Sequence, residues 1–188
     1  MYDLTVIGSG WAGYNAAVRA KELGLKVCLI EKSQIGGTCL NLGCIPTKTL
    51  IQSAKIYSLA KKASVFGIEV SAAQFNFLKI QERKENIIKQ LREGLQFMLK
   101  GIDLTPAEAK IISPEEVLAG SQKIKTKFIL IATGSDPFEL PFLKFDGKKI
   151  ISSNEALNLK APPATLLIIG GGVIGCEFAS LFSALGSQ

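Results

Sequence analysis

The feature that most constrains the fold is a glycine-rich turn that follows the first apolar segment of the chain. Residues 4–7 are apolar and partly β-branched, as expected for a buried parallel strand. Residues 8–13 then read Gly-Ser-Gly-Trp-Ala-Gly, a helical pattern extends to about residue 23, and a second apolar run, 27–30, ends at Glu31. This order of strand, glycine turn, helix, strand and acidic residue predicts a doubly wound, three-layer α/β fold of the Rossmann-like type that binds a dinucleotide.

Each glycine of this turn has its own expected role. Gly8 permits the turn, Gly10 lets the backbone approach a pyrophosphate, and Gly13 lets the helix pack closely on the strand. The helix N-terminus offers N–H groups to phosphates, and Glu31 is placed to accept hydrogen bonds from a ribose. The alternative is a tight strand-to-helix turn without a ligand, and the glycine pattern alone leaves it open.

A second glycine pattern lies near the other end of the sequence. Residues 165–169 are apolar and predict a strand, Gly170, Gly172 and Gly175 repeat the spacing of the first turn, and a helix is expected over about 176–185. A membrane-spanning helix is the alternative, because Glu177 is the only charge between residues 165 and 186. Three successive glycines and a central charge, which costs about 3 kcal/mol on insertion scales, argue against it. No second strand follows before residue 188, so we expect this second nucleotide-binding domain to be truncated.

The segment from residue 36 to residue 48, Gly-Gly-Thr-Cys-Leu-Asn-Leu-Gly-Cys-Ile-Pro-Thr-Lys, suggests redox chemistry. Five residues of helix advance about 7.5 Å, whereas disulfide-bonded Cα atoms lie about 4.4–6.8 Å apart, so pairing of Cys39 with Cys44 requires a backbone tighter than a helix. Gly43 and Pro46 fit such a distorted helix start. Two ordinary buried thiols are the alternative. No metal site is expected, because the chain has no histidine and its other two cysteines lie in unrelated apolar segments.

Taken together, these segments resemble the pyridine nucleotide–disulfide oxidoreductase family over the whole chain. The resemblance depends on four segments in the family's order, which are residues 8–31, 36–48, 129–135 and 170–177. Leu40 and Ile45 stand where glutathione and mercuric reductases usually carry valines, so the chain is most similar to the dihydrolipoyl dehydrogenase branch. Those reductases remain the alternative within the family.

The resemblance implies a role for each residue that matches the family's motifs. Cys39 would exchange with the substrate dithiol, Cys44 would face the flavin as a thiolate, and Lys48 would lie beside the flavin and pair with Glu177. The implied cofactors are FAD and NAD. The residues expected to bind them are Gly8, Gly10, Gly13, Glu31, Lys48, Thr133, Gly134, Gly170, Gly172 and Gly175.

The implied reaction is oxidation of a dihydrolipoyl group through a Cys39–Cys44 disulfide and FAD, with hydride passed to NAD⁺. The substrate would be carried on a protein of a 2-oxo acid dehydrogenase or glycine-cleavage complex, and the enzyme would be a homodimer. In the family the catalytic base is a histidine of a C-terminal domain of the partner subunit, and this chain has no histidine. We therefore expect the 188-residue chain to be inactive. Because the family's FAD fold borrows a segment from beyond residue 188, we also expect weak or absent flavin retention. A non-catalytic nucleotide-binding fragment is the alternative.

The expected domain organisation has three parts. Residues 1–140 form an FAD-binding domain that lacks the family's returning segment, 141–164 connect, and 165–188 begin an NAD-binding domain. Within the first part we expect a long helix over 76–100, short strands over 102–127, and a buried strand over 128–132.

Composition is consistent with this interpretation. The apolar fraction of 47% is typical of a globular α/β protein, and sparse cysteine without a secretory signal predicts a cytoplasmic setting. The net charge of +6 raises the question of nucleic acid, but the lysines are scattered along the chain, with one cluster on the helix expected near residues 79–100. Because Arg83, Lys84, Lys89 and Arg92 are expected on its solvated face without interleaved aromatic residues, we expect no nucleic-acid partner and no membrane partner.

Overall fold

The structure is a computed structural model that describes all residues from Met1 to Gln188. The chain divides into two compact units, and each is described by itself. Unit 1 comprises Met1–Asn41 and Lys89–Asp136, and unit 2 comprises Leu42–Ile88 and Pro137–Gln188. This division into units describes only which parts of the chain are compact, and it does not identify cofactor-binding domains. The domain boundaries inferred from the sequence therefore stay a prediction.

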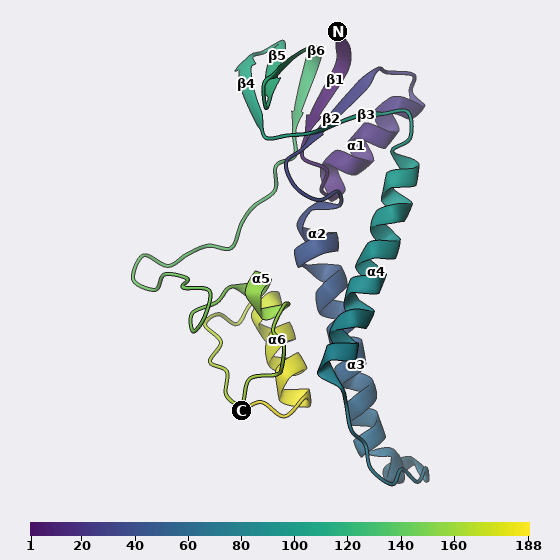
Figure 1. Ribbon diagram of the computed structural model, residues 1–188, viewed down its shortest axis with the longest axis vertical. Coiled ribbons are helices and arrows are strands. Elements are labelled where there is room, and N and C mark those ends of the chain that lie inside the picture. Colours follow the sequence, from purple (N-terminus) through teal and green to yellow (C-terminus); the bar gives the residue numbers. More distant parts are fainter. The chain divides into compact units, whose positions relative to one another are not determined.

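Unit 1 contains one six-stranded sheet in the order β3-β2-β1-β6-β5-β4 (Figure 1). The four strands β3, β2, β1 and β6 are parallel, and β4 and β5 extend the sheet in antiparallel orientation from β6. The strands are β1 (Tyr2–Ile7), β2 (Val27–Glu31), β3 (Asp103–Pro106), β4 (Ala109–Ser113), β5 (Glu116–Ala119) and β6 (Gln122–Ile131). Leu4 lies opposite Val27 of β2 and Phe128 of β6, so β1 has a parallel neighbour on each side. The doubly wound α/β prediction is confirmed.

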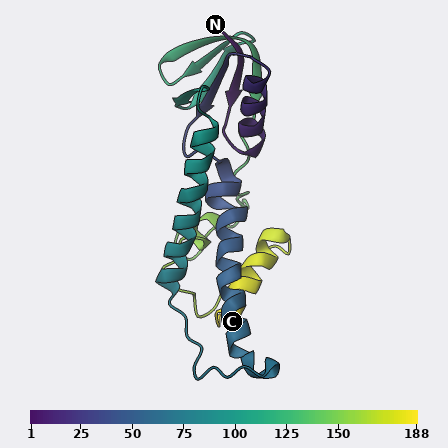
Figure 2. The ribbon, with the colours of Figure 1, turned by 90° about the vertical axis from the view of Figure 1, so that its right-hand side faces the viewer.

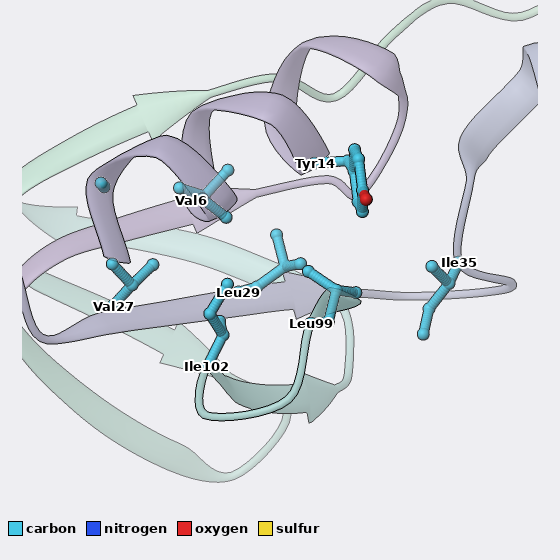
Figure 3. Close-up of a cluster of buried hydrophobic side chains, with 9 residues drawn as sticks. Val6, Tyr14, Val27, Leu29, Ile35, Leu99 and Ile102 are labelled. Atoms are coloured by element: carbon cyan, nitrogen blue, oxygen red, sulfur yellow. The ribbon is translucent and has the colours of Figure 1, made fainter. Parts of the chain in front are cut away.

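Helix α1 (Trp11–Glu22) connects β1 to β2 and buries a narrow face against the sheet. That face consists of Gly13, Tyr14, Ala17 and Ala20, whose small side chains let the helix lie close to the strands. Figure 3 shows the core that results, with Tyr14 and side chains of β1 and β2 meeting Leu99 and Ile102 from the segment after α4. Residues far apart in the sequence therefore hold the first βαβ unit together.

The prediction of a buried strand over residues 128–132 is wrong in its burial. Strand β6 is present and pairs with β1, but Phe128 is 70% exposed and Ile131 is 65% exposed. Ile129, Leu130 and Ala132 pack against the core clusters on the sheet, and all three are only partly buried. The layers packed on the sheet do not extend over Phe128 and Ile131, which is why these side chains stay exposed.

Unit 2 is mainly helical. It contains α3 (Cys44–Lys61), the 3₁₀ turn η1 (Ala63–Phe66), the first half of α4 (Phe77–Met98), α5 (Ser153–Ala156) and α6 (Val173–Ala184). Helix α6 packs on α3, and Figure 2 shows the two side by side. Leu50 and Ala54 of α3 meet Phe178, Leu181 and Phe182 of α6 in one buried cluster.

The segment before α6 differs from the sequence-based expectation. Residues 165–169 form no strand, because the segment makes only two backbone hydrogen bonds of a ladder type, Leu166 N–H to Gln188 O (2.8 Å) and Gln188 N–H to Ala164 O (3.0 Å). Helix α6 begins at Val173 rather than Cys176, because the helix starts inside the glycine motif, as α1 does. None of the helices is both long enough and apolar enough for a membrane span.

Helix α4 confirms the long helix predicted from the sequence but not its fully solvated basic face. Lys84 is 2% exposed, and its ammonium donates to Leu157 O (2.9 Å) and Asn158 Oδ1 (3.2 Å) while forming an ion pair with Glu85 (2.8 Å). Gln81, one turn earlier, also donates to Leu157 O (3.1 Å). Lys84 was predicted to face solvent because sequence periodicity cannot show that a segment 73 residues away supplies a carbonyl oxygen to its ammonium.

Candidate dinucleotide and redox site

The first glycine turn has the backbone geometry that a bound pyrophosphate requires. Gly8 adopts φ +97°, which only glycine adopts readily, and Gly10 is extended at the N-cap of α1. A Cβ at Gly13 would lie 3.0 Å from the carbonyl carbon of Gly8 and closer still to its oxygen. These three glycines therefore keep the loop free of side-chain atoms at the N-terminus of a twelve-residue helix.

The second glycine turn, in unit 2, repeats this geometry. Gly170 adopts φ +115°, and a Cβ at Gly175 would lie 3.2 Å from the carbonyl carbon of Gly170 and closer still to its oxygen. The N-cap residues also agree, with φ −73° and ψ 178° at Gly172 against φ −63° and ψ −179° at Gly10. Each unit thus has one dinucleotide-type turn, and the residues of both fit a pyrophosphate.

The first turn lies where the order of the parallel strands reverses. β2 lies on one side of β1 and β6 lies on the other, so the carboxyl ends of β1 and β6 meet at the switch point where α/β sheets bind ligands. A Cβ at Gly8 would lie 2.9 Å from the carbonyl carbon of Ala132 and 3.3 Å from the Cα of Thr133. Gly134 follows with φ +75° and is exposed. The structure therefore brings the segment around Thr133 to the phosphate-type turn.

Glu31 is held more firmly than the sequence indicates. One carboxylate oxygen accepts hydrogen bonds from the Ser9 backbone N–H (2.8 Å) and hydroxyl (2.7 Å), and the other accepts from the Ser33 N–H (2.9 Å) and hydroxyl (3.2 Å). Burial acts to raise the pKa of Glu31, but these hydrogen bonds outweigh it and lower the pKa below its ordinary value. A ribose hydroxyl would therefore have to displace or share with a serine hydroxyl. A pocket of about 130 Å³ opens beside Glu31, lined also by Ile35 and Leu104.

The two cysteines of the predicted redox segment lie in two consecutive helices that are separated by one residue, Gly43. Cys39 is half-buried in α2 (Gly37–Leu42), and Cys44 is exposed at the first residue of α3. Gly43 between them is not helical, with φ −142° and ψ −114°, and Pro46 lies in the first turn of α3, where its missing N–H is tolerated. The expected irregular helix start is confirmed. Their pairing as a disulfide stays a prediction.

The start of helix α2 contacts the first glycine turn in space. The Gly36 N–H donates to Ser9 O (3.1 Å), and a Cβ at Gly37 would lie 3.2 Å from the Gly10 nitrogen. Gly37 also adopts φ +59°, so a side chain is excluded both by conformation and by space. The backbone that leads to Cys39 is thus in contact with the turn that fits a pyrophosphate.

Lys48 and Glu177 form the ion pair that the resemblance implied, with 2.7 Å between the ammonium nitrogen and a carboxylate oxygen. Lys48 lies one helical turn after Cys44 on the same face of α3, and Glu177 lies in α6. The Lys48 side chain is 55% exposed and that of Glu177 is 23% exposed, so the pair is accessible to solvent. The ammonium therefore lies on the face of α3 that carries Cys44.

Three polar residues of this region were missed by sequence reasoning. They are Ser9 and Ser33, which hold Glu31, and Asn41, whose amide bonds to the turn before Cys39. Ser9 lies between two glycines of the motif, so its position was a usable signal. Asn41 gave none, because its partners are carbonyl oxygens that any residue carries.

The repeated glycine turns and the cysteine segment define an α/β protein with two dinucleotide-type turns and a two-cysteine segment whose first residues contact the first turn. Comparison with known families gives the same result at a finer level. The chain belongs to the family described as pyridine nucleotide-disulphide oxidoreductase, which it matches over residues 2–188.

Similar proteins carry a consistent name. The chain is 46% identical to a dihydrolipoyl dehydrogenase of Bacillus subtilis over 98% of its own length, and 42% identical to one of Acholeplasma laidlawii over its full length. It spans 42% and 58% of those proteins, respectively. Among solved structures, the HOCl-induced flavoprotein disulfide reductase RclA from Escherichia coli matches the whole chain with a TM-score of 0.84 and 33% identity, over 41% of that protein.

Proposed function

We propose that this chain supplies the flavin-side redox centre of a dihydrolipoyl dehydrogenase, with Cys39 and Cys44 as the reactive pair. The observation that carries the proposal is the contact between the turn before Cys39 and the first glycine turn, through Gly36 N–H to Ser9 O at 3.1 Å. This contact brings a thiol-bearing helix to the place where a dinucleotide's phosphates would bind. The names of similar proteins support the same activity.

The proposed thiol chemistry balances over two exchange steps. A thiolate of the dihydrolipoyl group attacks the Cys39 sulfur of the Cys39–Cys44 disulfide, a mixed disulfide forms, and Cys44 leaves as a thiolate. The second substrate thiol, once deprotonated, attacks the lipoyl sulfur of the mixed disulfide, which closes the lipoyl ring and releases Cys39. The substrate loses two electrons and two protons, and the protein disulfide gains the two electrons. Bound FAD would supply the acceptor for this electron pair and pass a hydride to NAD⁺.

Cys44 is suited to hold negative charge at its sulfur. It is the first residue of the 18-residue helix α3, so the positive end of the helix dipole lies near its side chain. Lys48 adds an ammonium one turn further along the same face, and Glu177 holds that ammonium at 2.7 Å. We propose that Lys48 stabilises the thiolate and the bound flavin, and that Glu177 orients Lys48.

The glycine turns would hold the two cofactors. Gly8, Gly10 and Gly13 would receive the FAD pyrophosphate, with Glu31 at its ribose and the segment of Thr133 and Gly134 closing beside it. Gly170, Gly172 and Gly175 would receive NAD⁺. We further propose that the substrate is a dihydrolipoyl group on a carrier protein of a 2-oxo acid dehydrogenase or glycine-cleavage complex, and that the complete enzyme is a homodimer.

Oxidised lipoamide and a Cys44→Ser variant of the chain test the assignment of Cys39. The Cys39 thiolate opens the lipoamide disulfide and forms a mixed disulfide that carries the released lipoyl thiol. Alkylation of that lipoyl thiol by N-ethylmaleimide prevents it from closing the ring again, so intact mass should rise by one lipoamide and one maleimide, mapped to Cys39. The wild-type chain should accumulate none, because Cys44 displaces the adduct. Cys44→Ser combined with Cys176→Ser is the matched control and should keep the adduct.

Two results would contradict the proposal. An adduct found equally on Cys176 or Cys28 would show that Cys39 has no special reactivity. Faster modification of Cys39 by glutathione disulfide than by lipoamide would favour a glutathione-type reductase over the lipoyl enzyme.

A further inference from the structure

Asn41 connects a turn, a helix and a distant arginine within unit 1. Its amide nitrogen donates to Gly37 O (2.9 Å) and Ile35 O (3.1 Å) and lies 3.4 Å from Gln34 O. Its amide oxygen accepts from the Arg92 guanidinium at 2.6 Å, from a residue 51 positions further along the chain. One side chain thus ties the carbonyl oxygens of residues 34–37 to helix α4.

The chemistry of these partners fixes the orientation of the amide. Carbonyl oxygens only accept, so they must meet the amide NH₂ group, and a guanidinium only donates, so it must meet the amide oxygen. The rotated amide would place oxygen against three carbonyls and NH₂ against a cation. Arg92 therefore selects the one rotamer of Asn41 that can hold the turn.

The turn that Asn41 holds leads directly to the two features of the proposed site. Gly36 and Gly37 both adopt positive φ, at +101° and +59°, and the Gly36 N–H donates to Ser9 O (3.1 Å) in the first glycine turn. Cys39 follows two residues after Gly37 in the same short helix as Asn41. Any rearrangement of residues 34–37 would move Cys39 relative to Ser9.

Arg92 is poorly suited to a purely stabilising role. Its Nε is buried and has no hydrogen-bond partner, and its charge is half-buried with an uncharged amide as its acceptor. A buried donor without a partner is unfavourable, and an apolar side chain of similar size avoids that penalty. The arrangement is therefore better explained by the orientation that the guanidinium imposes on the Asn41 amide than by a contribution of Arg92 to the stability of the fold.

We propose that Arg92 is a positioning residue that acts through Asn41 to hold residues 34–37 against the first glycine turn and thereby sets the position of Cys39. The consequence for thiol exchange depends on the proposed function. The geometric statement does not, because it concerns only the turn and its hydrogen bonds.

Hydrogen exchange in the full 188-residue chain tests the proposal. In Arg92→Leu, the amide of Gly36 should exchange about tenfold faster, as expected for the loss of one hydrogen bond to a charged group. The amide of Gly8, which donates to Ile30 O (2.8 Å), should exchange as in the wild type. The melting temperature should not fall, since Leu removes the unpaired Nε, and alkylation of Cys39 relative to Cys176 should accelerate.

Two further variants distinguish the hydrogen bond to Asn41 from the general loss of a guanidinium in unit 1. Arg92→Lys keeps a cation that can donate to Asn41 and should restore part of the protection at Gly36. Arg19→Leu is the matched control, because it removes an exposed guanidinium of unit 1 that pairs only with Glu22, and it should leave Gly36 unchanged.

Unchanged exchange at Gly36 in Arg92→Leu would overturn the proposal, and so would equal acceleration at Gly36 and Gly8 together with a lower melting temperature. Neither result bears on whether Cys39 exchanges with lipoamide, so the two proposals fail separately.

Discussion

Alanine at Gly13 and alanine at Gly94 should have opposite effects on stability, although both replace a helical glycine of unit 1. Neither glycine has a positive φ, so the backbone accepts alanine at both positions. A Cβ at Gly13 would lie 3.0 Å from the carbonyl carbon of Gly8 and closer to its oxygen, whereas a Cβ at Gly94 meets nothing within 4 Å. The comparison therefore isolates the close approach of α1 to the first glycine turn.

The expected magnitudes follow from these contacts. At Gly13 the helix must move away from the strand, and such overpacking reduces the free energy of unfolding by about 1–3 kcal/mol. At Gly94 the added methyl group restricts the unfolded chain without a clash and raises the free energy of unfolding by about 0.4–1 kcal/mol. Gly13→Ala should also weaken dinucleotide binding, because the carbonyl of Gly8 belongs to the turn.

Urea unfolding followed by far-ultraviolet circular dichroism and by fluorescence measures both effects. Trp11 is the only tryptophan and lies two residues before Gly13, so its emission reports on unit 1. A Gly13→Ala protein with a midpoint equal to or above that of the wild type would refute the argument that this glycine is required by close packing.

Three other outcomes are expected. A double-mutant cycle of Lys48→Met and Glu177→Gln should give a coupling of about 0.5 kcal/mol that decreases at high salt, because the pair is exposed; a coupling unaffected by salt would contradict this. The hydrogen bond from Tyr2 to Asp103, together with burial, raises the pKa of Tyr2 to about 12 from 10.0. The folded state therefore holds the phenol proton more tightly than the unfolded state does. The stability that this hydrogen bond contributes is present below pH 10 and is lost as pH rises towards 12. The difference in unfolding free energy between wild type and Tyr2→Phe should shrink over that range, and a constant difference would refute the assignment. Cys28 is fully buried and burial raises its pKa, so iodoacetamide should label it only after unfolding; labelling in the native protein would be the contrary result.

Much of the first nucleotide-binding unit could be predicted because its determinants are local in sequence. The positions of Gly8, Gly10 and Gly13 in one short segment specify the turn, and β1, α1 and β2 lie where the apolar periodicity predicts them. The Lys48–Glu177 ion pair was implied only by the family resemblance, since nothing in local spacing connects residues so far apart.

The errors have a common physical origin. The burial of Lys84 and the exposure of Phe128 depend on which segment covers each side chain, and residue character does not encode that. Residues 165–169 are apolar and β-branched enough for a strand, but a strand also needs a partner ladder, and Gln188 supplies only one pair of hydrogen bonds. Arg92 was expected to face solvent, and its hydrogen bond to Asn41 was not foreseen because it joins two distant segments of unit 1.

The most direct test of the proposed redox pair is the disulfide itself. The 188-residue chain is equilibrated in glutathione buffers of increasing oxidised fraction, quenched with acid, digested, and analysed for linked peptides by mass spectrometry. We predict one intrachain link, between Cys39 and Cys44, that forms and is reduced reversibly while Cys28 and Cys176 stay thiols. Failure of this link to form at any buffer composition, or a link from Cys39 or Cys44 to Cys176 in its place, would contradict the account.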